Sequence, residues 1–277
     1  MKQELHWSNA QGMNLYSSLW DIPAPRALIL LVHGQGEHIG RYEHIANFFN
    51  ARGMVVWGYD QQGFGRSAGA RGHARDVQDY LNDLKQFIRM ARERFPDIPL
   101  MLYGHSMGGN IVLHYTLRSA PSDLAGIIAT SPWVQLAFAP PAIKVWAGKL
   151  LRSLFPTLAL SSGLDTRYLC TDPEVVKVYN ADPLVHDKVS AAAGISLMES
   201  ARWIDGFSGG VPAPLLLMHS GADAITSPAA THALSQRLAG PVTWKEWPGL
   251  YHEMHNEPAQ QEVLRFIAEW TEGILES

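Results

Sequence analysis

The residue best suited to chemistry is Ser106, in the sequence GHSMG at 104–108. An apolar run over 100–103 precedes it and a helical pattern begins at Asn110, so the serine is expected at a sharp turn from a strand into a helix. The flanking glycines suit such a turn, because strand and helix approach within one residue of the serine and leave no room for side chains. The bare G-x-S-x-G spacing also arises by chance, in about one chain of this size in ten. Its flanks favour a nucleophile elbow, with the hydroxyl at the carboxyl edge of a sheet.

A serine hydroxyl is a poor nucleophile near neutral pH, so it needs a base, and the base needs an acid to orient it. Two candidates follow in the order Ser, Asp, His that α/β-hydrolases use, namely Asp223 and His252. Each comes just after a predicted strand, 215–218 or 242–247, so both loops should reach the same sheet edge as the serine. Asp223 is expected to orient the imidazole, and His252 to take the serine proton. The alternative for Asp223 is a turn or helix-cap residue.

Ester hydrolysis passes through a tetrahedral oxyanion, which backbone amides can stabilise. One amide is that of Met107, the residue after the serine, and the other comes from the loop after the first parallel strand. That loop reads HGQG over 33–36, and we assign the amide of Gln35 to the oxyanion hole. His33 is expected to support the loop rather than to act chemically.

These residues need a sheet whose strands end together, and the chain has the pattern of one. Continuous apolar runs, typical of strands buried on both faces, alternate with helical patterns. After a hairpin over 3–20, the sequence predicts an α/β fold with a mostly parallel sheet and helices on both faces. Strands are expected at 27–32, 54–57, 100–103, 124–129, 215–218 and 242–247, and helices at 42–52, 77–95 and 258–274.

The alternation breaks over residues 133–209, where no buried strand pattern occurs. We interpret this range as a helical cap inserted over the carboxyl edge of the sheet, between core segments 1–132 and 210–277; the alternative is an ordinary part of the core. Apolar residues recur there at helical spacing, at Ile143, Trp146, Leu150, Leu151 and Leu154. Basic residues lie among them, at Lys144, Lys149 and Arg152. The basic residues form either a solvated face or a surface for transient membrane contact.

Composition limits the class of protein. The chain has 277 residues, 47% of them hydrophobic, which is enough for a sizeable core. A net charge of −4 and the lack of a long basic run disfavour nucleic-acid binding. The single cysteine, Cys170, fits a reducing compartment and is either buried packing or a reactive thiol. Without a signal-peptide pattern or an apolar run of 18 residues, we expect a cytoplasmic protein with at most peripheral membrane association.

Three other motifs favour structural roles over chemistry. His252 and His255 stand in the sequence HEMH, which lacks the two-residue gap of the zinc motif HExxH. The glycines over 104–109 lack the G-x-G-x-x-G spacing of a dinucleotide loop. Asp60, which precedes glycines in 63–65, is expected to hold a turn rather than to serve as a second acid. The sequence therefore predicts an enzyme that uses neither a metal nor a cofactor.

The chain resembles the monoacylglycerol lipases, serine hydrolases often grouped as lysophospholipase-like. The resemblance covers nearly the whole chain and rests on HGQGEH at 33–38 with Arg41 and Tyr42, DQQGFGRS at 60–67, GHSMGG at 104–109, YNADPL at 179–184 and YHEMH at 251–255. It implies an α/β-hydrolase fold with a helical cap over an acyl channel, and hydrolysis of one fatty-acyl ester of glycerol.

The resemblance also implies roles for eight residues of this chain. They are Ser106, Asp223 and His252 as the triad, the amides of Gln35 and Met107 as the oxyanion hole, and Glu37, Arg41 and His255 as the polar pocket for the glycerol end. Gln35 departs from the family, in which a small or aromatic residue is commoner at this position. Only its amide is required, so the assignment stands.

The predicted function is therefore cofactor-free hydrolysis of a small lipid ester, a monoacylglycerol, through an acyl-enzyme. The alternative enzyme is a lysophospholipase or general carboxylesterase with the same triad. Epoxide hydrolases and haloalkane dehalogenases share the fold but have an acid at the elbow, so Ser106 argues against them. A hypothesis of another class is a ligand receptor on a hydrolase scaffold, which would keep the pocket and turn over slowly.

Overall fold

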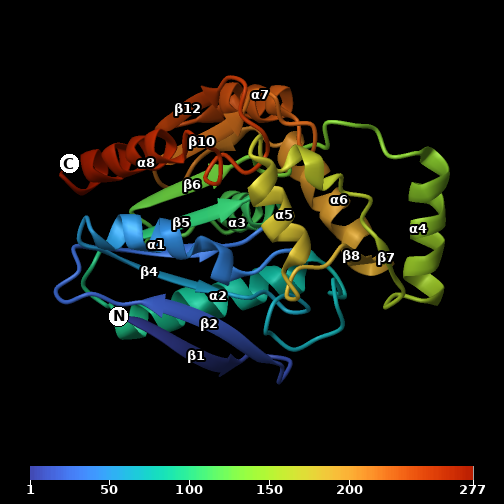
Figure 1. The fold of residues 1–277 in the computed structure, drawn as a ribbon, viewed down its shortest axis with the longest axis horizontal. Coiled ribbons are helices and arrows are strands. Elements are labelled where there is room, and N and C mark those ends of the chain that lie inside the picture. Colours follow the sequence, from blue (N-terminus) through green and yellow to red (C-terminus); the bar gives the residue numbers. More distant parts are fainter. Residues whose placement is uncertain (277) are drawn as a thin grey trace.

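The computed structural model describes residues 1–276, apart from the side chain of Lys144. One mixed sheet of eight strands forms its centre (Figure 1). β1 pairs antiparallel with β2 and β2 with β4, and all other neighbours are parallel. The predicted α/β fold with a mostly parallel sheet is confirmed. In spatial order the strands are β1 (Lys2–Ser8), β2 (Asn14–Trp20), β4 (Met54–Tyr59), β3 (Ala27–Val32), β5 (Leu100–His105), β6 (Gly126–Thr130), β10 (Leu215–Ser220) and β12 (Val242–Trp247).

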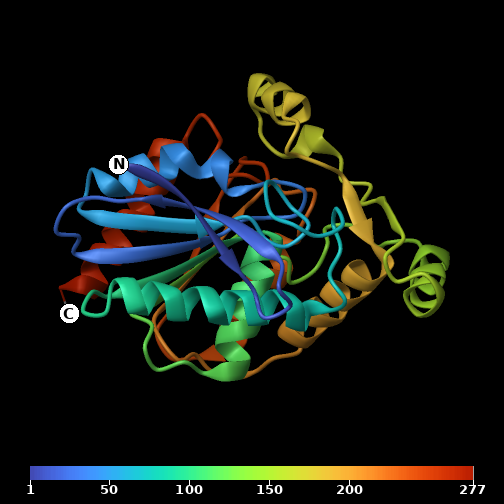
Figure 2. The same cartoon turned by 90° about the horizontal axis from the view of Figure 1, so that it is seen from below.

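The central strands are apolar along their length because helices cover both faces of the sheet. In β3, Leu28 and Leu30 pack into one core cluster, whereas Ile29 and Leu31 pack into the other. Figure 2 shows α1 and α2 on opposite sides of the strands. The first cluster contains residues of α2 (Val77–Arg94), α3 (Met107–Ser119), α6 (Ala191–Asp205) and α7 (Pro228–Arg237), and the second contains residues of α1 (Glu43–Asn50) and α8 (Gln260–Leu275).

Several elements lie within a few residues of the ranges expected from hydrophobic periodicity. The strands expected at 27–32 and 242–247 are β3 and β12, and the helix expected at 77–95 is α2. α2 begins after Asp76, whose side chain accepts a hydrogen bond from the backbone N–H of Gln78 at 2.9 Å. This cap satisfies one of the N–H groups that a helix leaves unpaired at its start.

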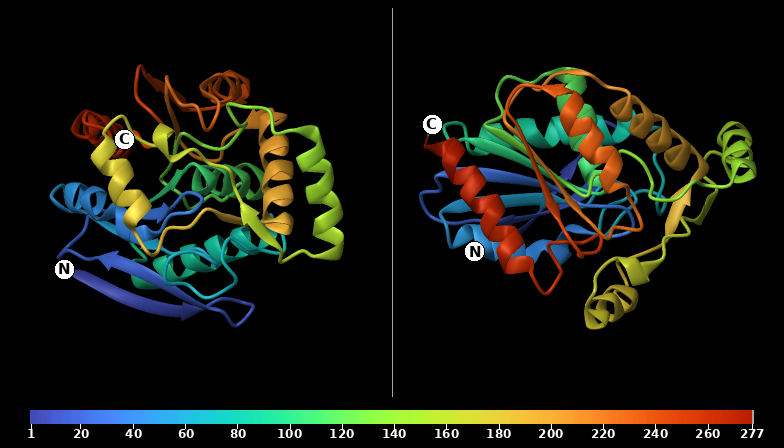
Figure 3. Two further views of the ribbon diagram at one scale, coloured as in Figure 1. Left: turned by 45° about the vertical axis from the view of Figure 1, so that its right-hand side comes forward. Right: turned by 90° about the horizontal axis from the view of Figure 1, so that it is seen from above.

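The chain between β6 and β10 carries an insertion of helices and short strands. α4 (Ala142–Leu154) lies at the edge of the molecule beside α6 (Figures 1 and 3). α5 (Pro173–Ala181) also belongs to this insertion and lies apart from α4. α6 lies in the range predicted as cap, yet its Leu197 and Ile204 pack into the first core cluster. The short elements of the chain are η1 (Ile39–Tyr42), β7 (Ala159–Ser161), η2 (Thr166–Tyr168), β8 (Lys188–Ser190), β9 (Gly209–Gly210) and β11 (Leu238–Ala239).

The outer face of α4 is apolar and exposed. Ile143 is 74% exposed and Trp146 is 66% exposed, and Leu150 and Leu154 also face solvent. Within residues 1–276, no helix is both long enough and apolar enough to cross a membrane. The stripe that the sequence predicted is therefore an uncovered face rather than part of the core.

Residues 186–190 of the insertion are bonded to two loops of the core. The backbone N–H of His186 donates to the carbonyl of Gly36 at 3.0 Å, and that of Ser190 donates to the carbonyl of Gly72 at 2.9 Å. Both glycines have positive φ, and a Cβ on Gly36 would lie 2.6 Å from the carbonyl oxygen of His186. We call 186–190 the anchor segment, because it ties the insertion to the loop that follows β3.

Candidate active site

Ser106 occupies the tight turn between β5 and α3 and is 7% exposed. Its φ of 55° and ψ of −116° are uncommon for a residue with a side chain. A Cβ on Gly104 would collide with the backbone of Gly108, and one on Gly108 would lie 2.6 Å from the carbonyl oxygen of His33. The two glycines therefore let β5, α3 and the loop after β3 meet around the serine.

His252 connects Ser106 to Asp223. Its Nε2 lies 2.8 Å from the Ser106 Oγ, and its Nδ1 lies 2.7 Å from Oδ2 of Asp223. Because an ionised carboxylate only accepts hydrogen bonds, the imidazole proton is at Nδ1, and Nε2 can accept the serine proton. Asp223 follows β10 and His252 follows β12. The structure thus brings together, from three separate loops, the residues that the sequence predicted as a triad.

Burial and charge have opposite effects on this pair. Burial lowers the pKa of His252, but the charge of Asp223 and the hydrogen bond to it raise that pKa above the ordinary value. Burial raises the pKa of Asp223, but the charge and hydrogen bonds of His252 and His219 lower that pKa far below its usual range. Asp223 is therefore ionised at neutral pH, which favours an imidazolium at His252.

Asp223 is also held by groups that the sequence analysis missed. The backbone N–H groups of Ile225 and Thr226 donate to its Oδ1 at 2.8 and 3.0 Å. The hydroxyl of Thr226 donates to Oδ2 at 2.9 Å, and Nε2 of His219 lies 3.1 Å from the same oxygen. His219 and Thr226 lie within four residues of the acid, so proximity in the sequence was the signal that could have identified them.

Met107 and Gln35 approach Ser106 from two different elements. Met107 is the first residue of α3, where backbone N–H groups lack partners within the helix. Gln35 lies in the loop after β3, and a Cβ on its neighbour Gly34 would lie 3.2 Å from the Cβ of Ser106. The Gln35 side chain reaches the anchor segment, where its Nε2 donates to the carbonyl of Lys188 at 2.9 Å. The loop assigned to the oxyanion hole is therefore tied to the insertion.

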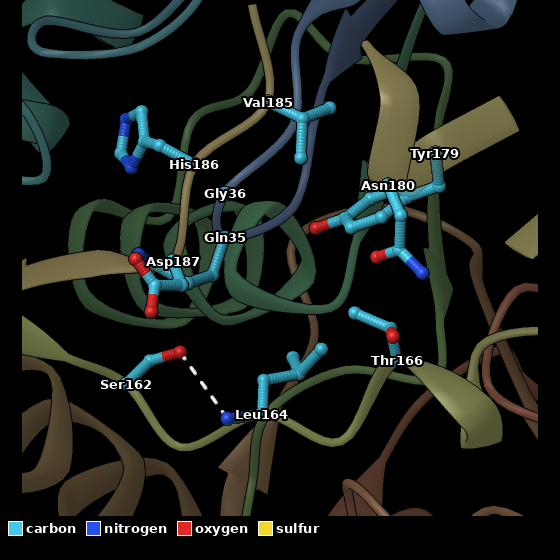
Figure 4. Close-up of a pocket in the computed structure, with 10 residues that line it drawn as sticks. All are labelled: Gln35, Gly36, Ser162, Leu164, Thr166, Tyr179, Asn180, Val185, His186 and Asp187. Atoms are coloured by element: carbon cyan, nitrogen blue, oxygen red, sulfur yellow. Dashed lines mark hydrogen bonds between the residues drawn. The ribbon is translucent and has the colours of Figure 1, made fainter. Parts of the chain in front are cut away.

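The space beside Ser106 is enclosed by the core and the insertion together. Ser106 and His252 line a small chamber with Leu164, Leu169 and Tyr179 of the insertion. A second cavity of about 190 Å³ adjoins it and shares Leu164, Tyr179 and Gln35 as lining residues. In Figure 4, Leu164 and Val185 point into this second cavity from opposite sides. Apolar and polar side chains therefore both line the space between the insertion and the loop after β3.

Glu37 lines the chamber of Ser106 but is already bonded within the protein. Its Oε1 accepts from the backbone N–H of Gly34 at 2.7 Å and from the hydroxyl of Tyr42 at 2.6 Å. Its Oε2 accepts from the guanidinium of Arg41 at 2.6 Å. Burial raises the pKa of Glu37, and the charge of Arg41 opposes this effect.

Arg41 is shared between Glu37 and Glu253, a residue that the sequence analysis did not single out. Arg41 donates two hydrogen bonds to the carboxylate of Glu253, at 2.6 and 2.7 Å, and its guanidinium lies 4.6 Å from the ring centre of Tyr179. Burial alone would raise the pKa of Glu253, but Arg41 lowers that pKa to about 2. This bidentate pair links the loop after β3 to the loop that carries His252.

His255, the third residue predicted for the glycerol end, is buried beside Tyr42 and His105. It is 1% exposed, and its ring stacks on Tyr42 with 5.1 Å between centres and meets His105 edge-on at 4.7 Å. Within the described part of the chain, neither of its ring nitrogens has a hydrogen-bond partner. Burial holds the pKa of His255 well below its ordinary value. The structure therefore brings Glu37 and Arg41 together near Ser106 and packs His255 against Tyr42 and His105.

Three further residues take structural positions. Nε2 of His33 accepts from the backbone N–H of Gln61 at 3.0 Å, and burial lowers the pKa of His33 to about 3. Asp60 accepts from the backbone N–H groups of Ile39 and Arg66, each at 2.7 Å. Cys170 is buried, which raises the pKa of its thiol to about 12 and disfavours the reactive thiolate. In residues 1–276 no group of three or more His, Cys, Asp and Glu side chains is placed to hold a metal ion.

The family model described as serine aminopeptidase, S33 matches residues 23–259. The chain belongs to the serine aminopeptidase S33 family. This S33 chain is 34% identical over 272 residues to the monoacylglycerol lipase of Mycolicibacterium smegmatis. The alignment covers 97% of this chain and 96% of that protein. It is 36% identical over 255 residues to an uncharacterized abhydrolase domain-containing protein of Dictyostelium discoideum, of whose length it spans only 27%.

A solved structure agrees with these relatives. The crystal structure of Paleococcus ferrophilus monoacylglycerol lipase matches the S33 chain with a TM-score of 0.83 at 33% identity, covering 94% of this chain and 99% of that one. The resemblance to the monoacylglycerol lipases and the α/β-hydrolase fold are both confirmed. This S33 protein is a carboxylic-ester hydrolase whose substrate is a lipid ester.

Proposed function

We propose that this S33 protein hydrolyses monoacylglycerols to a free fatty acid and glycerol through an acyl-enzyme on Ser106. The observation that carries the proposal is the unbroken contact from Ser106 through His252 to Asp223, with distances of 2.8 and 2.7 Å. The Mycolicibacterium and Paleococcus relatives are monoacylglycerol lipases, which supports glycerol as the alcohol that is released.

In the first half of the reaction, Oγ of Ser106 attacks the ester carbonyl carbon while Nε2 of His252 takes the hydroxyl proton. Asp223 keeps the Nδ1–H in place and stabilises the imidazolium. The amides of Gln35 and Met107 bind the tetrahedral oxyanion. As the intermediate collapses, the bond from the acyl carbon to the glycerol oxygen breaks and His252 gives that oxygen its proton.

In the second half, water attacks the acyl carbon of the ester on Ser106. His252 takes a proton from the water and then protonates the serine oxygen as the acyl–serine bond breaks. The fatty acid leaves, and both residues return to their starting protonation states. The two halves balance with water as the only co-reactant.

The insertion over residues 133–209 is proposed as the cap that receives the acyl chain. Leu164 and Leu169 give the chamber beside Ser106 an apolar wall on the insertion side, which suits a hydrocarbon chain. Adjacent exposed apolar side chains on α4 mark a surface that binds a partner. A lipid aggregate or membrane surface is the partner that suits a lipid-ester hydrolase. This contact is transient and peripheral in the proposal.

The glycerol end of the substrate is assigned to Glu37, Arg41 and His255. Glu37 lines the chamber of Ser106, and Arg41 orients its carboxylate. His255 can donate or accept through ring nitrogens that lack partners within residues 1–276. A site that hydrogen-bonds a hydroxyl rejects esters without one, because its own buried polar groups are then left unpaired. The opposing interpretation is that Glu37 and Arg41 form only a structural ion pair.

The other hypotheses receive less support. A lysophospholipase or a general carboxylesterase would use the same triad, but the two relatives at 34% and 33% identity are both monoacylglycerol lipases. A receptor that has lost turnover has no need of a complete proton path, whereas here Nε2 of His252 lies within hydrogen-bond distance of the serine oxygen.

A substrate panel tests the proposed reaction. The wild-type protein is expected to release glycerol from a monoacylglycerol faster than it hydrolyses diacylglycerol or lysophosphatidylcholine. Ser106→Ala should lose covalent labelling by a fluorophosphonate probe and at least roughly a thousandfold in kcat, and His252→Ala and Asp223→Asn should lose orders of magnitude while remaining folded. Labelling of folded Ser106→Ala, or full activity of His252→Ala, would refute the mechanism.

A second comparison tests the assignment of the glycerol end. Glu37→Gln and His255→Ala should raise KM for a monoacylglycerol far more than for the methyl ester of the same fatty acid. Equal losses on both esters, together with a lower melting temperature, would instead identify Glu37 and Arg41 as a structural pair.

A further inference from the structure

A second histidine contacts the triad acid. His219 lies near the end of β10, and both its side chain and that of Asp223 are completely buried. Its Nε2 lies 3.1 Å from Oδ2 of Asp223, and its Nδ1 lies 2.9 Å from the hydroxyl oxygen of Thr231 in α7. The ring therefore bridges a helix on one face of the sheet to the carboxylate at the edge of the sheet.

The two partners determine which ring nitrogen of His219 carries the proton. Asp223 is ionised and can only accept, so the proton is at Nε2. Nδ1 can pair with Thr231 in either tautomer, because a hydroxyl can donate as well as accept. With this arrangement His219 donates a hydrogen bond to Asp223.

His219 competes with His252 for the same carboxylate oxygen. Three donors surround Oδ2 of Asp223: Nδ1 of His252 at 2.7 Å, the hydroxyl of Thr226 at 2.9 Å and Nε2 of His219 at 3.1 Å. One carboxylate oxygen has two lone pairs, so each donor reduces the negative charge that the other two experience.

We propose that His219 is a positioning residue of the triad, which fixes the carboxylate of Asp223 and takes up part of its charge so that His252 passes its proton more readily to the leaving alcohol. The inference rests on the proposed function, because it assigns Asp223 and His252 their roles in ester hydrolysis. It predicts that removing the Nε2–H of His219 strengthens the hold of Asp223 on the His252 proton.

The other charged groups around His252 are not altered by a change at His219. Asp223 raises the pKa of His252 most, and the charges of Glu253 and Glu37 raise it further. His105, whose ring centre lies 4.9 Å from that of His252, is kept neutral because burial lowers its pKa to about 3. A change in the titration of His252 after substitution of His219 therefore reports on Asp223.

The test compares two substitutions on a soluble short-chain ester, with active enzyme counted by fluorophosphonate titration. His219→Leu fills the space without a donor and should lower kcat about tenfold with KM unchanged. It should also move the acidic limb of kcat/KM to higher pH by at least about half a unit, since the full charge of Asp223 then acts on His252. His219→Gln keeps an N–H donor and should stay within about threefold of wild type, with its acidic limb unmoved.

Thr231→Val is the matched control, because it leaves the His219 ring in place and removes only its partner in α7. Its acidic limb should match that of wild type even if its melting temperature falls. The proposal is overturned if His219→Leu keeps the wild-type kcat and acidic limb, or if His219→Gln loses as much activity as His219→Leu.

A measurement on the wild-type protein makes the test independent of how the variants fold. Histidine labelled with ¹⁵N should show a proton on Nε2 of His219. A proton at Nδ1 alone would refute the proposed donor. If Asp223→Asn instead keeps full activity, the proposed function fails while the tautomer result stands, so the two failures are distinguishable.

Discussion

Replacing Glu253 by glutamine should destabilise the folded protein by about 3 kcal/mol at pH 7. The two hydrogen bonds from Arg41 and its charge outweigh the effect of burial and lower the pKa of Glu253 from 4.5 to about 2. At about 1.4 kcal/mol for each tenfold change, the ionised carboxylate contributes about 3 kcal/mol. Because the folded pKa lies below the unfolded one, this stability is present above about pH 4.5 and is lost as the pH falls toward 2.

Glu37 provides the matched comparison, because it shares Arg41 with Glu253. Burial raises the pKa of Glu37, and the charge of Glu253 adds to that effect. A carboxyl with a raised folded pKa contributes stability below its unfolded pKa and loses it as the pH rises through the folded value. The charge of Glu37 therefore adds no stability at pH 7, and Glu37→Gln should cost less than Glu253→Gln.

Thermal unfolding at pH 7 measures the difference. Glu253→Gln should lower Tm by roughly 6–12 °C, at about 2–4 °C for each kcal/mol. The exposed pair of Glu174 and Lys177, with 3.0 Å between its charged atoms, supplies a control, and Glu174→Gln should change Tm by less than about 2 °C. The reasoning is refuted if Glu253→Gln melts within about 2 °C of wild type, or if Glu37→Gln is the more destabilising of the two.

Three further outcomes follow from the structure. Trp146→Asp with Leu150→Asp should reduce hydrolysis of a micellar long-chain monoacylglycerol about tenfold and leave a soluble short ester unaffected, because burial of the exposed face of α4 in lipid is lost; equal activity on micelles would contradict the proposed contact. The profile of kcat/KM against pH should fall as the pH drops through the pKa of His252, above 6.5, since the imidazole must be unprotonated to act as base; a limb well below pH 6 would oppose this. Gly108→Ala should abolish soluble, probe-reactive protein, because the new Cβ would lie 2.6 Å from the carbonyl oxygen of His33; a fully active variant would show that the turn has room to spare.

The main parts of the fold and site could be predicted because each is marked by neighbours in the sequence. Ser106, Asp223 and His252 all follow predicted strands, and parallel strands with helical crossovers end at one edge of a sheet. The glycines beside Ser106 indicate the tight turn by their spacing alone. A local sequence pattern therefore predicted which distant residues meet, because the strands they follow all end at the same edge of the sheet.

The features that were missed depend on contacts between distant segments. Glu253 follows His252 directly, but its partner Arg41 lies 212 residues away, and nothing in the local sequence relates the two. α6 was assigned to the cap because its helical pattern does not reveal what its apolar side packs against; Leu197 and Ile204 belong to the main core. Periodicity indicates that a helix has a buried side, and only the tertiary structure shows which surface buries it.

The anchor segment limits how this insertion could be exchanged between related enzymes. Residues 186–190 are bonded to the carbonyl of Gly36, and the side chain of the neighbouring Gln35 donates to Lys188. An insertion transplanted whole would set a foreign strand against the loop proposed to bind the oxyanion, so the loop would have to be transplanted with it. A chimera joined just before residue 186 would keep this native contact, but the exchanged part would still have to reproduce the pairing of Asp182 with His38 and the packing of Tyr179 on Arg41.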